Sequence, residues 1–253
     1  MKFNNPMNLI HVTKLENLSS ILDNGLKYSV SREVLQHVKK TQNDESFRKG
    51  DFYIPMISFF GMEIKEHLNL AQSYGNLGII LNYKYTNKML NPVRYINEYS
   101  ILSSRIANFE DNLKGMNPGV LEASFRGTGT GFRTEAIRMY VENIIYSKSF
   151  TSELSRRNII TNEYEIVNNN FHFGLEREWR LIPLQLYDDL RRIKKLDSKD
   201  TEVVDYGYCN IKNSITGFIV SSQEHKDFVI NLLQDKKIEI SNERIIISEG
   251  YGK

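Results

Sequence analysis

The stretch FGLEREWRLIP, residues 173–183, places two glutamates, two arginines and the only tryptophan of the chain within five residues, and then continues as an apolar strand. Because alternate residues of a strand face opposite sides, Glu176, Glu178 and Arg180 are predicted to share one face. Two interpretations remain open. One is an edge strand with a ladder of ion pairs, which discourages aggregation. The other is a pair of carboxylates that face a cleft, with Arg180 holding their charge.

The composition limits the class of protein. The chain has 253 residues, of which 40% are hydrophobic, enough for one large domain or two small ones. Its single cysteine, Cys209, excludes a disulfide framework. No apolar run approaches the roughly 20 residues that a membrane helix needs, and the N-terminus lacks the pattern of a secretory signal. A net charge of +2 does not require a nucleic-acid partner. These features predict a soluble, cytoplasmic protein without a membrane segment.

The hydrophobic patterns alternate between strand and helix periodicity, which predicts a single α+β domain with a mixed sheet. The polar run 36–52 is expected to be an exposed loop, and the region at about 97–170 a mostly helical insertion. Strands are expected at 8–13, 53–60, 77–85, 215–222 and 244–249. Helices are expected at 14–26, 62–75 and 223–236.

Other candidate sites are weaker. The sequence RGTGTGFR, residues 126–133, lacks the Lys-Ser/Thr of a P-loop and is interpreted as a flexible loop, although its flanking Arg126 and Arg133 could contact an anion. The five histidines include no HExxH pair, so no metal site is predicted. His11 lies within an apolar strand, where a core histidine and a ligand-binding one are both possible.

Several motifs together resemble known families. HVTKLENLSSILDNGL followed by Arg32 resembles the N-terminal signature of DarT, a family of toxins that ADP-ribosylate thymidine in DNA. Most of the chain resembles the AbiGi family of abortive-phage-infection proteins, through IPMISFF, HLNLAQSYGNLGIILNYKY, NPVRYI and EREWRLIP in this order. These resemblances imply an ADP-ribosyltransferase-like split mixed sheet whose central cleft holds NAD.

The resemblance assigns roles to residues on the expected strands. His11 and Thr13 would bind the ribose on the adenosine side of NAD, and Arg32 would lie near the phosphates. Tyr74 would stack on nicotinamide. Ser58 loosely matches the Ser or Thr often found on the second strand of such folds.

The carboxylates of the opening stretch would carry the chemistry. Glu178 would stabilise the oxocarbenium-like transition state as nicotinamide leaves, and Glu176 would position or deprotonate the acceptor. The charges would then face a cleft rather than the core. Arg126, Phe132 and Arg133 would contact a nucleic-acid acceptor.

Three functions follow from these readings. The first is a NAD-dependent ADP-ribosyltransferase in phage defence or a toxin–antitoxin system, acting on nucleic acid or protein. The alternative is a non-catalytic antitoxin or regulator of an abortive-infection pair that keeps the same fold, since AbiGi-type proteins are the antitoxin-like partner of such a pair and fold does not imply function. The third is a structural or interaction protein whose charged strand is an ion-pair ladder.

Overall fold

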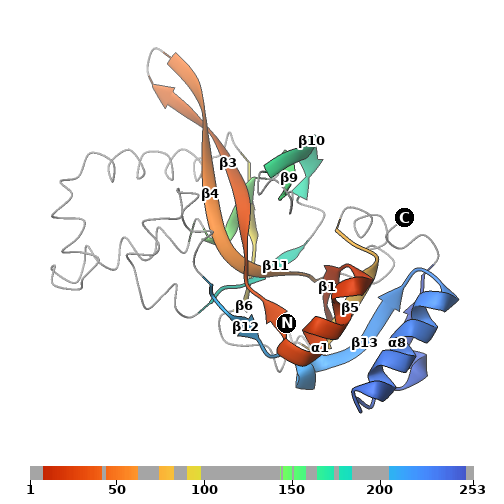
Figure 1. Ribbon diagram of the computed structural model, residues 1–253. Helices are drawn as coiled ribbons and strands as arrows, with labels where there is room; N and C mark the ends of the chain where they lie inside the picture. Colours follow the sequence, from red (N-terminus) through yellow and green to blue (C-terminus); the bar gives the residue numbers. More distant parts are fainter. Residues whose placement is uncertain are drawn as a thin grey trace, which may run out of the picture.

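A computed structural model describes residues 8–41, 44–61, 74–82, 90–97, 143, 145–149, 151–157, 164–173, 177–183 and 205–248 (Figure 1). The central element is an eight-stranded sheet with the order β14-β13-β5-β1-β4-β11-β6, and β3 pairs with β4 beside this path. Its strands are β1 (Asn8–Thr13), β3 (Ser29–Thr41), β4 (Asp44–Phe60), β5 (Leu77–Asn82), β6 (Leu90–Pro92), β11 (Glu178–Leu181), β13 (Ile215–Val220) and β14 (Ile245–Ile247). Every pair is antiparallel except β13 with β14.

Six further strands form three two-stranded sheets in the described part of the chain. They are β2 (Leu26–Lys27) with β12 (Tyr208–Cys209), β7 (Arg94–Ile96) with β8 (Ser147–Ser149), and β9 (Thr151–Arg157) with β10 (Tyr164–His172). The fold is therefore mixed, with a large and mostly antiparallel sheet and few helices among the described residues.

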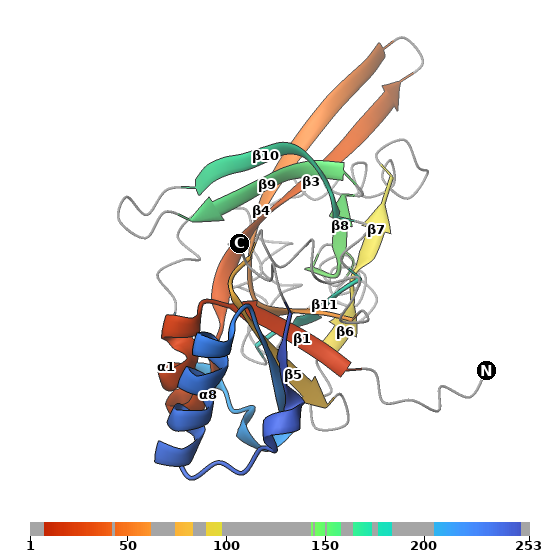
Figure 2. The same cartoon turned by 90° about the vertical axis from the view of Figure 1, so that its right-hand side faces the viewer.

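Two helices, α1 (Leu18–Asn24) and α8 (Gln223–Asp235), lie side by side on one face of the sheet (Figure 2). The α8 helix begins at Ser222, whose side chain accepts a hydrogen bond from the backbone N–H of His225. Val229 and Leu233 are four residues apart, so both lie on the side of α8 that is buried. They join a core of leucine, isoleucine, valine and phenylalanine side chains from both helices and seven strands of the sheet.

Both ends of the chain contribute to the same sheet. On one edge β5 pairs with β1, for example His11 with Ile79, and on the other it pairs with β13, for example Phe218 with Ile79. The β-α-β unit formed by β13, α8 and β14 closes one end of the sheet with a parallel pair. A segment from the middle of the sequence is thus held between the two terminal segments.

The expected strands at 8–13 and 215–222 and the helix at 223–236 are confirmed to within two residues. The loop expected at 36–52 is wrong: residues 36–41 belong to β3 and residues 44–52 to β4, and the two strands pair in register up to Thr41 and Asp44. Polar composition favours a loop, but pairing between the strands decides the backbone conformation here. Residues 62–73 of an expected helix lie outside the described residues, and the described parts of the expected helical insertion include β8, β9 and β10.

Candidate functional site

The charged stretch forms a strand inside the sheet. β11 pairs with β4 on one side and with β6 on the other, so the edge-strand interpretation is wrong. Arg177 precedes the strand with a left-handed φ of 46°. The strand, and with it the alternation of faces, begins at Glu178, and Glu176 lies outside the described residues.

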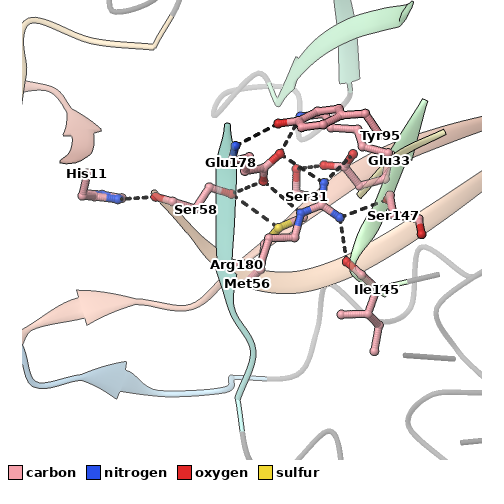
Figure 3. Close-up of polar contacts among 11 residues, drawn as sticks. His11, Ser31, Glu33, Met56, Ser58, Tyr95, Ile145, Ser147, Glu178 and Arg180 are labelled. Carbon is pink, nitrogen blue, oxygen red and sulfur yellow. Dashed lines mark hydrogen bonds and ion pairs between the residues drawn. The ribbon is translucent and has the colours of Figure 1, made fainter. Parts of the chain in front are cut away.

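The carboxylate of Glu178 accepts hydrogen bonds on both oxygens (Figure 3). Oε1 accepts from Ser58 Oγ at 2.9 Å and from Arg180 Nε at 2.9 Å. Oε2 accepts from Lys148 Nζ at 3.0 Å and from Arg180 Nη2 at 3.3 Å. The backbone N–H of Glu178 donates to the Tyr95 hydroxyl at 2.8 Å, so both the side chain and the backbone of this residue are fixed.

Arg180 connects three distant segments of the chain. Besides Glu178, its Nη2 lies 3.0 Å from Oε2 of Glu33 on β3, and its Nη1 donates to the carbonyl of Ile145 at 2.7 Å. Glu33 also accepts a hydrogen bond from Ser31 Oγ at 3.3 Å. Glu178 and Arg180 are 4% and 0% exposed, so their charges are buried inside the protein instead of facing an open cleft.

Among the described residues, the charges of the cluster are balanced. Glu33 and Glu178 supply two negative charges, and Lys148 and Arg180 supply two positive ones, all four with buried side chains. Burial alone would raise the pKa of Glu178, but the charges of Arg180 and Lys148 outweigh it and lower the pKa from 4.5 to about 2. Burial would likewise lower the pKa of Arg180, and the two glutamates raise it instead. Glu178 and Arg180 therefore stay ionised at neutral pH.

His11 lies where the sheet begins to divide. β1 and β4 share a single register pair, Ile10 with Phe60. The next carbonyl of β4 that points toward β1 belongs to Ser58, and His11 Nδ1 lies 2.9 Å from it, so this ring nitrogen donates the hydrogen bond. The ring of His11 packs edge-on against Phe59, and burial lowers the pKa of His11.

His11 and Glu178 belong to opposite faces of the sheet. Glu178 opposes Phe60, which in turn opposes Ile10, and residues directly opposite in a sheet share a face. His11 follows Ile10 and therefore lies on the other face, beside Phe59. Among the described residues, Ser58 connects the two: its carbonyl accepts from the ring and its hydroxyl donates to the carboxylate.

The other residues expected at an NAD site are dispersed or outside the described chain. Tyr74 packs on Phe60, with ring centroids 5.2 Å apart, and so lies near Glu178. Thr13, at the end of β1, accepts a hydrogen bond from Asn17 Nδ2 at 3.2 Å. Arg32 lies between Ser31 and Glu33 on β3. Because alternate residues of a strand face opposite sides, Arg32 belongs to the face opposite the cluster. Glu176, Arg126, Phe132 and Arg133 lie outside the described residues.

Sequence reasoning missed three members of the cluster: Glu33, Lys148 and Tyr95. They come from β3, β8 and β7, far from β11 in the sequence, and no local pattern marks them. The signal that could have found them is electrostatic. A buried Glu-x-Arg pair requires compensating partners for every charge and donor, because unpaired buried charges are costly.

An open depression of about 590 Å³ lies elsewhere, where β1 leads into the first 3-10 helix, η1 (Leu15–Asn17). Its lining residues are Lys14, Leu15, Glu16, Gly75, Asn76 and Phe228. None of the residues assigned to NAD binding is among them. In the described ranges, no group of three or more His, Cys, Asp or Glu side chains could hold a metal ion.

Among the residues that the structure describes, no helix is both long and apolar enough to cross a membrane.

Acidification is expected to destabilise the fold through Glu178. Because its folded pKa of about 2 is below the ordinary 4.5, the ionised carboxylate stabilises the folded state fully above about pH 4.5. This contribution, on the order of 3 kcal/mol, is lost as the pH falls from 4.5 towards 2. Urea unfolding at pH 7, 4.5 and 3 would measure it. Glu178→Gln lacks the titrating group, so its free energy of unfolding should fall less over the same interval; an equal fall in both proteins would contradict the assignment.

Comparisons with known proteins show to which family the chain belongs. A comparison with curated proteins found no match, and neither did a comparison with solved structures. The family model described as "Putative abortive phage resistance protein AbiGi, antitoxin" matches residues 27–213. This range contains the whole buried charge cluster: β3, β4, β7, β8 and β11. The chain belongs to the AbiGi family.

Proposed function

We propose that this protein is the antitoxin of an abortive-infection pair and that it neutralises its toxin by binding it, without transferring ADP-ribose. The observation that carries this proposal is the saturation of the Glu178 carboxylate. A carboxylate has about four lone-pair positions. Here Ser58, Lys148 and Arg180 supply four hydrogen bonds to it, two on each oxygen.

A saturated and neutralised carboxylate is poorly suited to ADP-ribosyl transfer. The departure of nicotinamide develops positive charge on the ribose, and a catalytic glutamate helps by placing an uncompensated negative charge beside it. Glu178 is 4% exposed, and Lys148 and Arg180 already balance its charge together with that of Glu33. It would have to break these ion pairs to accept a hydrogen bond from a ribose hydroxyl.

The position of His11 supports the same proposal. An NAD molecule bound in one cleft would need the ribose-binding histidine and the catalytic glutamate on the same side. The strand register assigns His11 and Glu178 to opposite faces. The fold then acts as a rigid scaffold, and toxin recognition resides on its surface.

An ADP-ribosyltransferase is the second candidate, and one arrangement favours it. His11, Ser58 and Glu178 lie on the three neighbouring strands β1, β4 and β11, and Tyr74 packs against Phe60 beside Glu178. The separation of β1 from β4 after one register pair is what an ADP-ribosyltransferase-like split sheet would require. If the protein is an antitoxin, this arrangement is a structural framework that no longer catalyses a reaction.

Two measurements on the full chain separate the candidates. Expressed alone, the protein should leave bacterial growth unchanged, and co-expressed with the toxin of the same pair it should restore growth and co-purify with that toxin. The purified protein should show no thermal shift with NAD. It should also release no nicotinamide in the presence of mixed DNA, RNA and cell lysate.

The opposite result would establish the second candidate. This would be release of nicotinamide by the wild type that is lost in Glu178→Gln, with the circular dichroism spectrum of the variant unchanged. Failure to restore growth or to bind the toxin would exclude the antitoxin proposal by itself.

A further inference from the structure

The outward side of α8 carries one large apolar side chain among carboxylates. Figure 2, turned so that the right-hand side of Figure 1 faces the viewer, shows α8 at the front of the drawn fold. Five exposed residues of this helix recur three and four positions apart, so they lie along one side of it. They are Glu224, Asp227, Phe228, Asn231 and Asp235, which we call the α8 face.

The α8 face is acidic. Three of its five residues are Asp or Glu and none is Lys or Arg, so its net charge is −3. The cation within the helix, Lys226, is half-buried and lies three residues before the buried Val229, on the side of the helix that faces the core. A partner that approaches the α8 face therefore meets carboxylates around a single aromatic ring.

The helix dipole accounts for only part of this charge. A carboxylate near the N-terminus of a helix is stabilised by the positive end of the dipole, which explains Glu224 in the first turn. Asp235 is the last residue of α8, where the negative end of the dipole disfavours it, and the last turn contains no basic residue. The next residue, Lys236, is ion-paired with Asp23 of α1. Helix stability thus does not explain the charge at this end of the face.

Phe228 also forms one wall of the open depression of about 590 Å³. Its side chain is 46% exposed. The other walls are fixed by close contacts: Asn76 Oδ1 accepts a hydrogen bond from the backbone N–H of Leu15 at 2.8 Å, and a Cβ at Gly75 would come within 2.2 Å of the Thr13 carbonyl oxygen. The depression is therefore preformed, and it is large enough for an apolar side chain together with part of its backbone.

We propose that the α8 face and the depression bind a basic segment of the toxin. An apolar side chain of that segment would occupy the depression against Phe228, and its Lys or Arg side chains would lie opposite Glu224 and Asp227. This inference rests on the proposed function, because it identifies the surface by which the antitoxin holds its toxin. Aromatic side chains beside well-packed pockets contribute much of the affinity of protein interfaces, and surrounding charges guide a partner of opposite sign.

The charge of the α8 face disfavours other partners. The phosphates of nucleic acids and of anionic lipids would be repelled by three carboxylates. A second copy of this chain, bound through the same patch, would bring two acidic faces together, because a two-fold contact joins the same surface of both subunits. Lys14 and Glu16, which line the depression, lie 3.5 Å apart as an ion pair and leave the sign of the charge unchanged. A basic protein segment is the occupant whose charge fits.

The first test measures the binding of the purified toxin to the full-length protein by surface plasmon resonance. Phe228→Ala should weaken binding at least about tenfold, mainly through faster dissociation, because the apolar contact exists only in the complex. Tyr208→Ala is the matched control: Tyr208 is 49% exposed, and it belongs to β12 instead of the α8 face. Its dissociation constant should stay within about twofold of that of the wild type.

The second test concerns the charge and should change association. The face variant replaces Glu224 with Gln and both Asp227 and Asp235 with Asn. From about 50 to 500 mM salt, the association rate constant of the wild type should fall about tenfold and that of the face variant no more than about threefold. A control variant neutralises three exposed carboxylates elsewhere and should keep the salt dependence of the wild type; its substitutions are Glu165→Gln, Asp205→Asn and Glu243→Gln.

The outcomes distinguish this inference from the proposed function. If the wild type does not bind the toxin, the proposed function fails, and this inference fails with it. If the wild type binds but Phe228→Ala binds equally tightly, or if the face and control variants lose equally, the α8 face is not the toxin-binding surface and the antitoxin function stands. All the variants should keep the thermal midpoint of the wild type, because every substituted side chain is exposed.

Discussion

Arg180→Met is expected to lower the free energy of unfolding by about 3–5 kcal/mol. Arg180 is 0% exposed and is ion-paired with both Glu178 and Glu33, which are 4% and 6% exposed. Methionine fills much of the same volume but leaves two buried carboxylates with Lys148 as the one remaining cation among the described residues of the cluster. Breaking a buried ion pair by removing one partner is costly because the remaining charge keeps its desolvation penalty.

Urea unfolding at pH 7, followed by circular dichroism, would measure this effect. Arg244→Met is the matched control, because Arg244 is exposed and its side chain donates only a long hydrogen bond of 3.4 Å to a backbone carbonyl. Its free energy of unfolding should change by less than about 0.5 kcal/mol. If Arg180→Met behaved like this control, the cluster would not hold the fold together.

A double-mutant cycle of Arg180→Met and Glu178→Gln would test whether Glu178 is the ion-pair partner of Arg180. Once Arg180 is absent, the charge of Glu178 is no longer fully compensated, so adding Glu178→Gln should cost much less than it does in the wild type. A coupling of about 1–3 kcal/mol is expected for residues in one network. Additive effects would contradict a shared ion-pair network, even if both single variants were destabilised.

Removal of the segments outside the family match is expected to abolish folding. A fragment of residues 27–213 retains β5 but loses β1 and β13, which pair with its two edges. It also loses α1 and α8, which cover the core on one face of the sheet. The fragment should show no cooperative thermal transition and should aggregate through the exposed edges of β5.

Substitutions at two neighbouring residues of α8 test, without truncation, whether the C-terminal segment is needed for folding. Val229 is 0% exposed and packs in the core, whereas Phe228 is 46% exposed. Val229→Asp buries an unpaired carboxylate and should destabilise the protein by roughly 4 kcal/mol or more. Phe228→Asp should change stability by less than about 1 kcal/mol. A stable fragment 27–213, or equal effects of the two substitutions, would show that the terminal segments form an accessory layer.

Local sequence patterns predicted several strands of the sheet and its last helix. The apolar strands at 8–13 and 215–220 and the helix at 223–235 are visible because each carries its own hydrophobic period over six or more residues. The sequence also marked Glu178, Ser58 and His11 as candidates, and these residues do lie on adjacent strands. Periodicity and composition are local properties, so they predict local structure well.

The role of the charged strand depends on contacts with distant segments of the chain. The sequence FGLEREWRLIP is compatible with an ion-pair ladder, with a catalytic cleft and with a buried cluster, because the partners of Glu178 and Arg180 are not encoded nearby. Lys148 is 30 residues away from Glu178 in the chain, and Glu33 is 147 residues away from Arg180. Whether a carboxylate is free to react or saturated by cations depends on which distant segments fold against it. That arrangement is fixed by strand pairing and burial, and no local pattern reports it.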